Sequence, residues 1–97
     1  MNNFCGLTVK NLEDAVKVGR LDLDLQYNSS PTMRDYLEFM KEHPKFKAHG
    51  YYSDDEIIIE GIECVCPSID DIIDFVREFR NADDFVVTKQ KCYCWFD

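Results

Sequence analysis

The segment from His49 to Val76 constrains the fold of this chain most strongly. It combines the most apolar stretch of the sequence with its densest run of negative charge. Its central part, Glu56 to Cys66, is rich in isoleucine and is typical of a buried strand. The same 28 residues contain no lysine or arginine, and they contain eight carboxylates: Asp54, Asp55, Glu56, Glu60, Glu63, Asp70, Asp71 and Asp74. We therefore expect the core and the strongest electrostatic feature in the same part of the chain.

The length and composition favour one globular domain over residues 1–97. A chain of 97 residues fits a single domain with a modest hydrophobic core. An apolar content of 45% separates it from disordered chains. No apolar run approaches the roughly 18 residues that indicate a membrane span, and the N-terminus lacks the charged and apolar regions of a secretory signal. These features predict a cytoplasmic protein.

The net charge of −8 is distributed unevenly along the chain. Residues 1–50 carry equal numbers of acidic and basic side chains, so residues 51–97 hold the whole excess of negative charge. A polarised acidic surface repels nucleic acid and lipid headgroups and attracts basic protein surfaces. Solubility alone is the alternative interpretation of this charge.

A β-hairpin is predicted over residues 46–66. Phe46 to Tyr52 forms its first strand, Ser53-Asp54-Asp55 supplies residues that favour turns, and Glu56 to Cys66 returns as the second strand. Gly61 within the second strand predicts a bulge or the close approach of another backbone.

Two amphipathic helices are predicted beside this hairpin. The first begins at Ser30-Pro31, where serine can cap and proline suits the first helical position, and it ends at His43-Pro44. The second begins at a capping box of Ser68 and Asp71 and closes at Asn81. Its apolar stripe is predicted to contain Ile69, Ile72, Ile73, Val76 and Phe79.

The alternation of apolar and polar residues from Leu21 to Tyr27 predicts another strand, half-buried, with Asp22 and Asp24 on its polar face. After the second helix, residues 85–96 form either one long strand or two strands joined around residues 89–91. The order from residue 21 onward is then β-α-β-β-α-β, a ferredoxin-like α+β plan in which two helices cover one face of an antiparallel sheet.

In the ferredoxin-like plan, the strands at 21–27 and 56–66 lie side by side at the centre of the sheet. Residues 4–9 form a further strand, followed by a short helix that Asn11 caps and Gly19 ends. This N-terminal β-α unit is expected as an extension at an edge or end of the sheet.

A carboxylate cluster is expected on the sheet face that the helices leave uncovered. Asp22 and Asp24 would meet Glu56 and Glu60 of the neighbouring strand there. The cluster has three interpretations: it is solvated or paired with Lys89 and Lys91, it docks arginine or lysine side chains of a protein partner, or it holds Mg²⁺ or Ca²⁺.

A recognition edge is expected where Tyr51 and Tyr52 adjoin the acidic turn, because tyrosine anchors many interfaces. Together with the acidic residues, these tyrosines give the predicted partner-binding set: Asp22, Asp24, Tyr51, Tyr52, Asp54, Asp55, Glu56, Glu60, Asp70 and Asp71.

No catalytic motif is present, so no catalytic residues and no cofactor are predicted. The chain lacks a Gly-x-Ser-x-Gly elbow, a phosphate-binding glycine-rich loop and a His-Glu-x-x-His motif. His43 and His49 are expected at the surface. The Cys64/Cys66 and Cys92/Cys94 pairs are predicted to be reduced, buried thiols, with a zinc site or redox sensing as alternatives.

These features predict a small acidic protein that binds proteins rather than nucleic acid or membranes. The most specific version of this prediction is an inhibitor that docks on the nucleic-acid-binding surface of a nuclease or similar partner, with carboxylates in place of phosphates. In size, acidity and lack of catalytic motifs the chain resembles small phage-encoded inhibitors of host defence, such as anti-CRISPR proteins, which act in the host cytoplasm. A divalent-metal-dependent hydrolase using Asp22, Asp24 and Glu60 and a homo-oligomeric regulatory domain are the alternatives.

Overall fold

The hairpin of β2 (Lys47–Ser53) and β3 (Glu56–Val65) lies at the centre of the computed structural model, which describes residues 2–97. It confirms the predicted hairpin. Asp54 and Asp55 form its two-residue turn with φ angles of +50° and +68°. Two consecutive residues in this left-handed region are typical of the turn type that matches the twist of a hairpin, and aspartate tolerates that region better than most residues do. The acidic turn is thus also a conformational requirement of the hairpin.

The sheet has five strands in the order β1-β2-β3-β5-β4, and all neighbouring strands are antiparallel. The N-terminal strand β1 (Asn2–Leu7) lies at one edge, as expected for an extension. The C-terminal segment forms two strands, β4 (Asp84–Val87) and β5 (Lys91–Trp95), rather than one. An α+β fold with an antiparallel sheet is therefore confirmed.

The predicted strand at 21–27 is wrong, because this segment forms no sheet ladder. Its alternation does describe burial: Leu21 is buried, and Leu23 and Leu25 pack partly against the core. The carbonyl groups of Leu23 and Leu25 accept hydrogen bonds from the backbone of Arg34 and Met33, at the start of a helix. The segment therefore satisfies free N–H groups of a helix N-terminus instead of a neighbouring strand.

Without a strand at 21–27, the expected pairing of that segment with 56–66 does not exist. The neighbours of β3 are β2 and β5. The strand order of the ferredoxin-like plan is consequently not reproduced, although both predicted helices and an antiparallel sheet are present.

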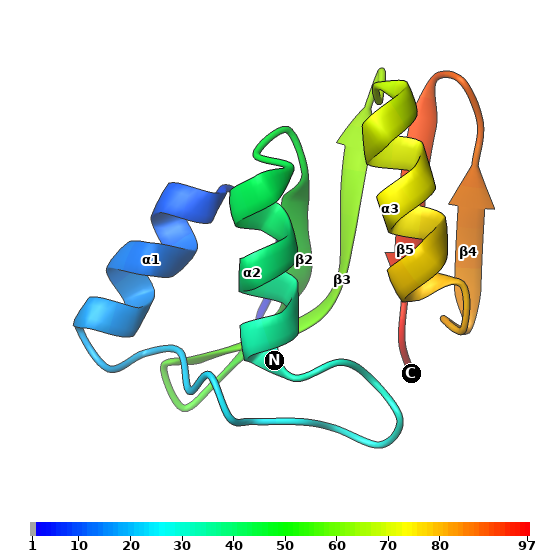
Figure 1. Cartoon of the computed structure of the whole chain (residues 1–97). Coiled ribbons are helices and arrows are strands. Elements are labelled where there is room, and N and C mark those ends of the chain that lie inside the picture. Colours follow the sequence, from blue (N-terminus) through cyan, green and yellow to red (C-terminus); the bar gives the residue numbers. More distant parts are fainter. Residues whose placement is uncertain (1) are drawn as a thin grey trace.

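Three helices lie on one side of the sheet (Figure 1): α1 (Val9–Lys17), α2 (Met33–Glu42) and α3 (Ile69–Phe79). Within residues 2–97 no helix could cross a bilayer, since α3, the longest, has 11 residues and a crossing needs about 20.

Each helix begins with a capping box, in which a side chain and a backbone exchange hydrogen bonds: Thr8 with Asn11, Thr32 with Asp35, and Ser68 with Asp71. The box at Ser68 confirms the prediction. The other two helices are capped by threonines rather than by Asn11 and Ser30. Ser30 is buried, and its hydroxyl donates to the Tyr27 carbonyl at 2.6 Å.

The predicted apolar stripe of α3 is confirmed at Phe79 and in part at Ile72, but it is wrong at Ile69 and Ile73. Ile69 and Ile73 are 73% and 48% exposed, whereas Phe75 and Phe79 are buried. Phe75 lies between Phe46 and Phe85, with ring centroids at 5.4 and 5.2 Å. The large aromatic rings fill the space between helix and sheet, and the isoleucines at the edges of the stripe are turned to solvent.

A β-bulge in β3 confirms the prediction of a bulge or a close backbone approach at Gly61. His49 pairs with Gly61 and Gly50 pairs with Ile59, so Glu60 is the extra residue. A Cβ atom added at Gly61 would lie 1.9 Å from the carbonyl oxygen of Cys94 on β5. Only glycine permits this approach of the two backbones.

We expect Gly61→Ala to lower the free energy of unfolding by about 3 kcal/mol, since the added methyl group forces β3 and β5 apart. Gly19→Ala is the matched control: Gly19 has a φ of +76° but open space around it, so only backbone strain of about 1 kcal/mol is expected there. Urea denaturation of both variants measures the difference. Equal losses would show that the contact at Gly61 relaxes without cost.

Candidate functional site

The two ends of the sheet differ in charge. One end, here called the hairpin end, contains the β2–β3 turn, the start of β4 and the end of β5, as the pairs Ser53–Glu56 and Asp84–Trp95 show. Figure 1 shows this end at the bottom, where the C-terminus also lies. The acidic residues of this end are Asp22, Asp24, Asp54, Asp55, Glu56, Asp83, Asp84 and Asp97.

The opposite end of the sheet is rich in lysine. Lys47 begins β2 and Lys91 begins β5, where it pairs with Val65 at the end of β3. Lys45 precedes β2, and Lys89 lies in the turn between β4 and β5. Four lysines therefore lie at the end of the sheet opposite the acidic turn, together with Asp70 and Asp71 at the start of α3.

Arg20 and Arg34 lie among the acids of the hairpin end, and Arg80, the C-cap of α3, also lies toward this end. Arg34 pairs with Asp24 at 3.0 Å, but both side chains are more than half exposed, and such pairs bind weakly. The Nε–H group of Arg20 donates to the backbone carbonyl of Asp55 at 2.9 Å, and its guanidinium lies 5.8 Å from the centre of the Tyr52 ring. The carboxylates of Asp54 and Asp55 remain exposed.

The structure divides the predicted partner-binding residues among four places. Asp22, Asp24, Asp54, Asp55 and Glu56 lie at the hairpin end. Tyr51 and Glu60 line a cavity described below. Tyr52 lies on the helix side of the sheet, where its ring is 5.1 Å from that of Phe4. Asp70 and Asp71 lie at the far end, in the first turn of α3.

The expected sheet face shared by Asp22, Asp24, Glu56 and Glu60 is wrong, because Asp22 and Asp24 belong to a loop. Lys89 and Lys91, their predicted counter-ions, lie at the opposite end of the sheet. Tyr51 and Tyr52 also fail to form one recognition edge, since successive residues of a strand face opposite sides.

A further acidic group was not anticipated and lies between α2 and α3. Asp35, Glu38 and Glu42, spaced three and four residues apart, follow one side of α2 and line a hollow together with Glu78 of α3. Burial, and then the negative charge of Asp35, raises the pKa of Glu78. The helical spacing of the first three is visible in the sequence, but their approach to Glu78 is not.

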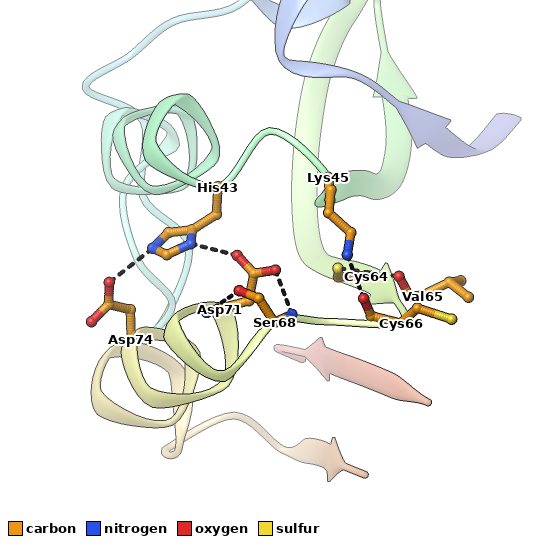
Figure 2. Close-up of polar contacts among 8 residues, drawn as sticks. All are labelled: His43, Lys45, Cys64, Val65, Cys66, Ser68, Asp71 and Asp74. Atoms are coloured by element: carbon orange, nitrogen blue, oxygen red, sulfur yellow. Dashed lines mark hydrogen bonds and ion pairs between the residues drawn. The ribbon is translucent and has the colours of Figure 1, made fainter. Parts of the chain in front are cut away.

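His43, expected at the surface, is buried (Figure 2). Its Nδ1 atom lies 2.7 Å from Asp71 and its Nε2 atom 2.9 Å from Asp74, so the ring joins the end of α2 to the start of α3. Asp71 also accepts the backbone N–H of Ser68 at 2.9 Å as part of the capping box. The two carboxylates occupy both ring nitrogens, which leaves neither free to act as a general base. The cluster is therefore a structural link between two helices.

The electrostatics of this link favour a charged imidazolium. Burial lowers the pKa of His43, but hydrogen bonds to Asp71 and then Asp74 outweigh that effect and raise it overall. Burial likewise raises the pKa of Asp71, and the bonds from Ser68 and His43 reverse the shift and lower it. Both partners are thus stabilised in their charged forms.

His49 was also expected at the surface, yet its side chain is only 12% exposed. It lies on the sheet face opposite the helices, stacked on Tyr93 with ring centroids 5.0 Å apart. Burial lowers the pKa of His49, although the charge of Glu63, 3.8 Å away, opposes this shift. His49 is therefore a neutral packing residue at neutral pH.

The cysteines are free thiols with different surroundings. Cys64, Cys92 and Cys94 are buried, as predicted, but the prediction is wrong for Cys66, which is exposed, as Cys5 is too. Burial raises the pKa of Cys92 to about 11 and that of Cys94 to about 12, so both are protonated at neutral pH. Within the part of the chain that the structure describes, no three or more His, Cys, Asp or Glu side chains are grouped so that they could hold a metal ion.

No family model matches this sequence, and no curated protein and no solved structure is significantly similar to it. The function must therefore be inferred from the residues themselves.

The His43 link predicts a pH-dependent stability. A raised pKa for His43 means that its contribution is complete below the unfolded value of about 6.5 and is lost as the pH rises through the folded pKa. The lowered pKa of Asp71 means that its contribution is present above about 3.9 and is lost as the pH falls through the folded pKa. The link therefore stabilises the fold most between these two values.

We expect His43→Gln to lower the free energy of unfolding by about 2 kcal/mol at pH 5–6 and by less as the pH approaches 9. Denaturant unfolding at several pH values gives the difference between the variant and the unmodified protein. Lys10→Gln is the control, because it breaks the exposed pair with Asp14 and should cost less than about 0.5 kcal/mol. A loss at His43 that is constant from pH 5 to pH 9 would contradict the charged link.

Proposed function

We propose that this chain is a small acidic inhibitor that binds a basic surface of another protein through its hairpin end. The observation that carries the proposal is the gathering of exposed carboxylates at that end, with Lys45, Lys47, Lys89 and Lys91 at the other. Carboxylates form strong, short hydrogen bonds with arginine and lysine, as phosphates do. The hairpin end thus suits a protein surface that otherwise binds nucleic acid, such as that of a nuclease.

The geometry of the turn supports binding of a basic surface through the hairpin end. Asp54 and Asp55 project from a two-residue turn fixed between long paired strands. A fixed turn loses little conformational entropy on binding, so more of the interaction energy appears as affinity. The acidic field also speeds the approach of a basic partner. These properties, with the small size, support an anti-defence inhibitor of the anti-CRISPR kind acting in the cytoplasm of a phage-infected cell.

Self-association is a second candidate, supported by a different observation. No helix of residues 2–97 lies on the sheet face opposite α2 and α3 (Figure 1), and Val65 and Val86 on that face are 69% and 41% exposed. Paired sheet faces of this kind would give a homo-oligomeric regulatory domain. A mass by analytical ultracentrifugation that stays monomeric at 100 times the working concentration would reject this candidate. The metal-dependent hydrolase has no such support, since Asp22 and Asp24 do not share a face with Glu60.

The inhibitor proposal is tested with an Asp54→Asn, Asp55→Asn double variant. Asparagine removes both charges but keeps the left-handed turn, which alanine would strain. Tagged protein captures partners from a lysate of the source cell at low salt, and mass spectrometry identifies proteins that leave at high salt. We expect a basic nucleic-acid-binding protein whose purified form binds the double variant about tenfold more weakly, equivalent to about 1.4 kcal/mol.

The matched control is Glu13→Gln with Asp70→Asn, which removes the same charge from exposed positions outside the hairpin end. Its affinity for the purified partner should stay within about twofold. A partner that binds both variants with equal affinity would reject the hairpin end as the binding surface.

A further inference from the structure

A cavity of about 210 Å³ opens beside the hairpin end, where the β3 bulge, the end of β5 and the loop after α1 meet. The residues that line it include two tyrosines, Tyr27 and Tyr51, the buried Ile58 and Phe96, and two acidic residues, Glu60 and Asp97. No lysine, arginine or histidine of the described residues lines it. The cavity is therefore aromatic and acidic.

The bulge places Glu60 in this cavity. Glu60 is the extra residue between the pairs His49–Gly61 and Gly50–Ile59, and bulges reorient the side chains they contain. Its carbonyl accepts the backbone N–H of Phe96 at 2.8 Å, which fixes the backbone there. Within residues 2–97 its half-buried carboxylate has neither a hydrogen-bond donor nor an ion-pair partner. The backbone of Glu60 is thus fixed, and its carboxylate is unpaired.

Tyr27 and Tyr51 line the same cavity as Glu60. Burial raises the pKa of Tyr51, and the nearby Tyr27 and Glu60 groups add to this effect. Tyr27 is 43% exposed, so its ring borders the mouth of the cavity. Aromatic faces and a carboxylate are both groups that attract cations.

Hydrogen bonds hold the loop wall of the cavity in place. The Asn28 side chain donates to the carbonyl of Asp97 at 3.1 Å, and the Gln26 side chain donates to the carbonyl of Ser30 at 2.8 Å. The Ser30 hydroxyl in turn donates to the carbonyl of Tyr27. A wall fixed in this way need not reorganise to receive a ligand.

We propose that this cavity binds one arginine side chain of the basic partner, with its guanidinium paired to Glu60 and packed against Tyr27 and Tyr51. The inference rests on the proposed function and assigns the chemistry of its central contact. The volume is below the roughly 300 Å³ at which small-molecule sites begin, and it suits a single side chain. Arginine fits better than lysine, because its planar group can stack on aromatic rings while donating two hydrogen bonds to one carboxylate.

The test is an NMR titration of ¹⁵N-labelled protein with N-acetyl-arginine amide. We expect saturable shifts of the amide signals of Tyr27, Tyr51 and Glu60. N-acetyl-citrulline amide has nearly the same shape without the charge and should cause no saturable shift. Equal responses to the arginine and citrulline compounds, or shifts confined to other residues, would overturn the proposal. If N-acetyl-lysine amide bound with the same affinity as the arginine compound, the assignment to a guanidinium group would be overturned.

Two variants and one control make the assignment specific. Glu60→Gln should lower the affinity for the arginine compound about tenfold. Tyr27→Ala, at an exposed loop position, should lower this affinity several-fold. Glu63→Gln removes the same charge from the same strand outside the cavity and should leave the affinity within twofold. A Glu60→Gln protein that folds and binds as before would also overturn the proposal.

The captured partner separates this inference from the proposed function. A partner that is lost with the Asp54→Asn, Asp55→Asn variant but retained by Glu60→Gln at unchanged affinity overturns the cavity alone. Binding of the arginine compound that depends on Glu60, without any salt-sensitive partner, supports the cavity and rejects docking through the hairpin end.

Discussion

The bulge at Glu60 is the constraint on which the rest of this structure depends. Side chains of a regular strand alternate between faces, so an unbroken β3 that buries Ile57 and Ile59 would also direct Glu63 into the core. The extra residue shifts the alternation by one position, and Ile62 and Cys64 face the core instead. Gly61 makes the shift possible, because β5 approaches too closely for any side chain there. The same shift directs Glu60 to the cavity, so the packing of the core and the candidate binding site have one origin.

Elements specified by neighbouring residues were predicted well from the sequence. The hairpin follows from its turn residues, and the start of α3 follows from the spacing of Ser68 and Asp71. The segment 21–27 was misinterpreted because alternation reports which side chains are buried, not which groups the backbone bonds. Its leucines do face the core, but its carbonyl groups bond a helix N-terminus. Period-two burial and membership of a sheet are therefore separate properties, and only the first can be read from the pattern.

Contacts between distant residues account for most of the candidate site that the sequence did not predict. His43 and Asp71 are 28 positions apart, and each has an ordinary local role, at a helix end and in a capping box. The distribution of charge over the surface could not be predicted for a similar reason. The two halves of the sequence do not correspond to two regions of the surface. Asp22 and Asp24 come from the electrically neutral half and join the acidic end, whereas Lys89 and Lys91 come from the acidic half and leave it.

The carboxylates of the hairpin end and the four lysines of the opposite end distribute charge unevenly along the sheet. A uniform negative charge would only draw the protein toward a positive surface, but a dipole also experiences a torque in the field of that surface. In the proposed complex, this torque would turn the hairpin end toward the basic partner before the two proteins touch, and it would shorten the rotational search that limits most protein associations. At high salt this orienting effect acts only within a few ångströms, since counter-ions screen the field. For the proposed partner, the arrangement of charge would thus set the direction of approach as well as its strength.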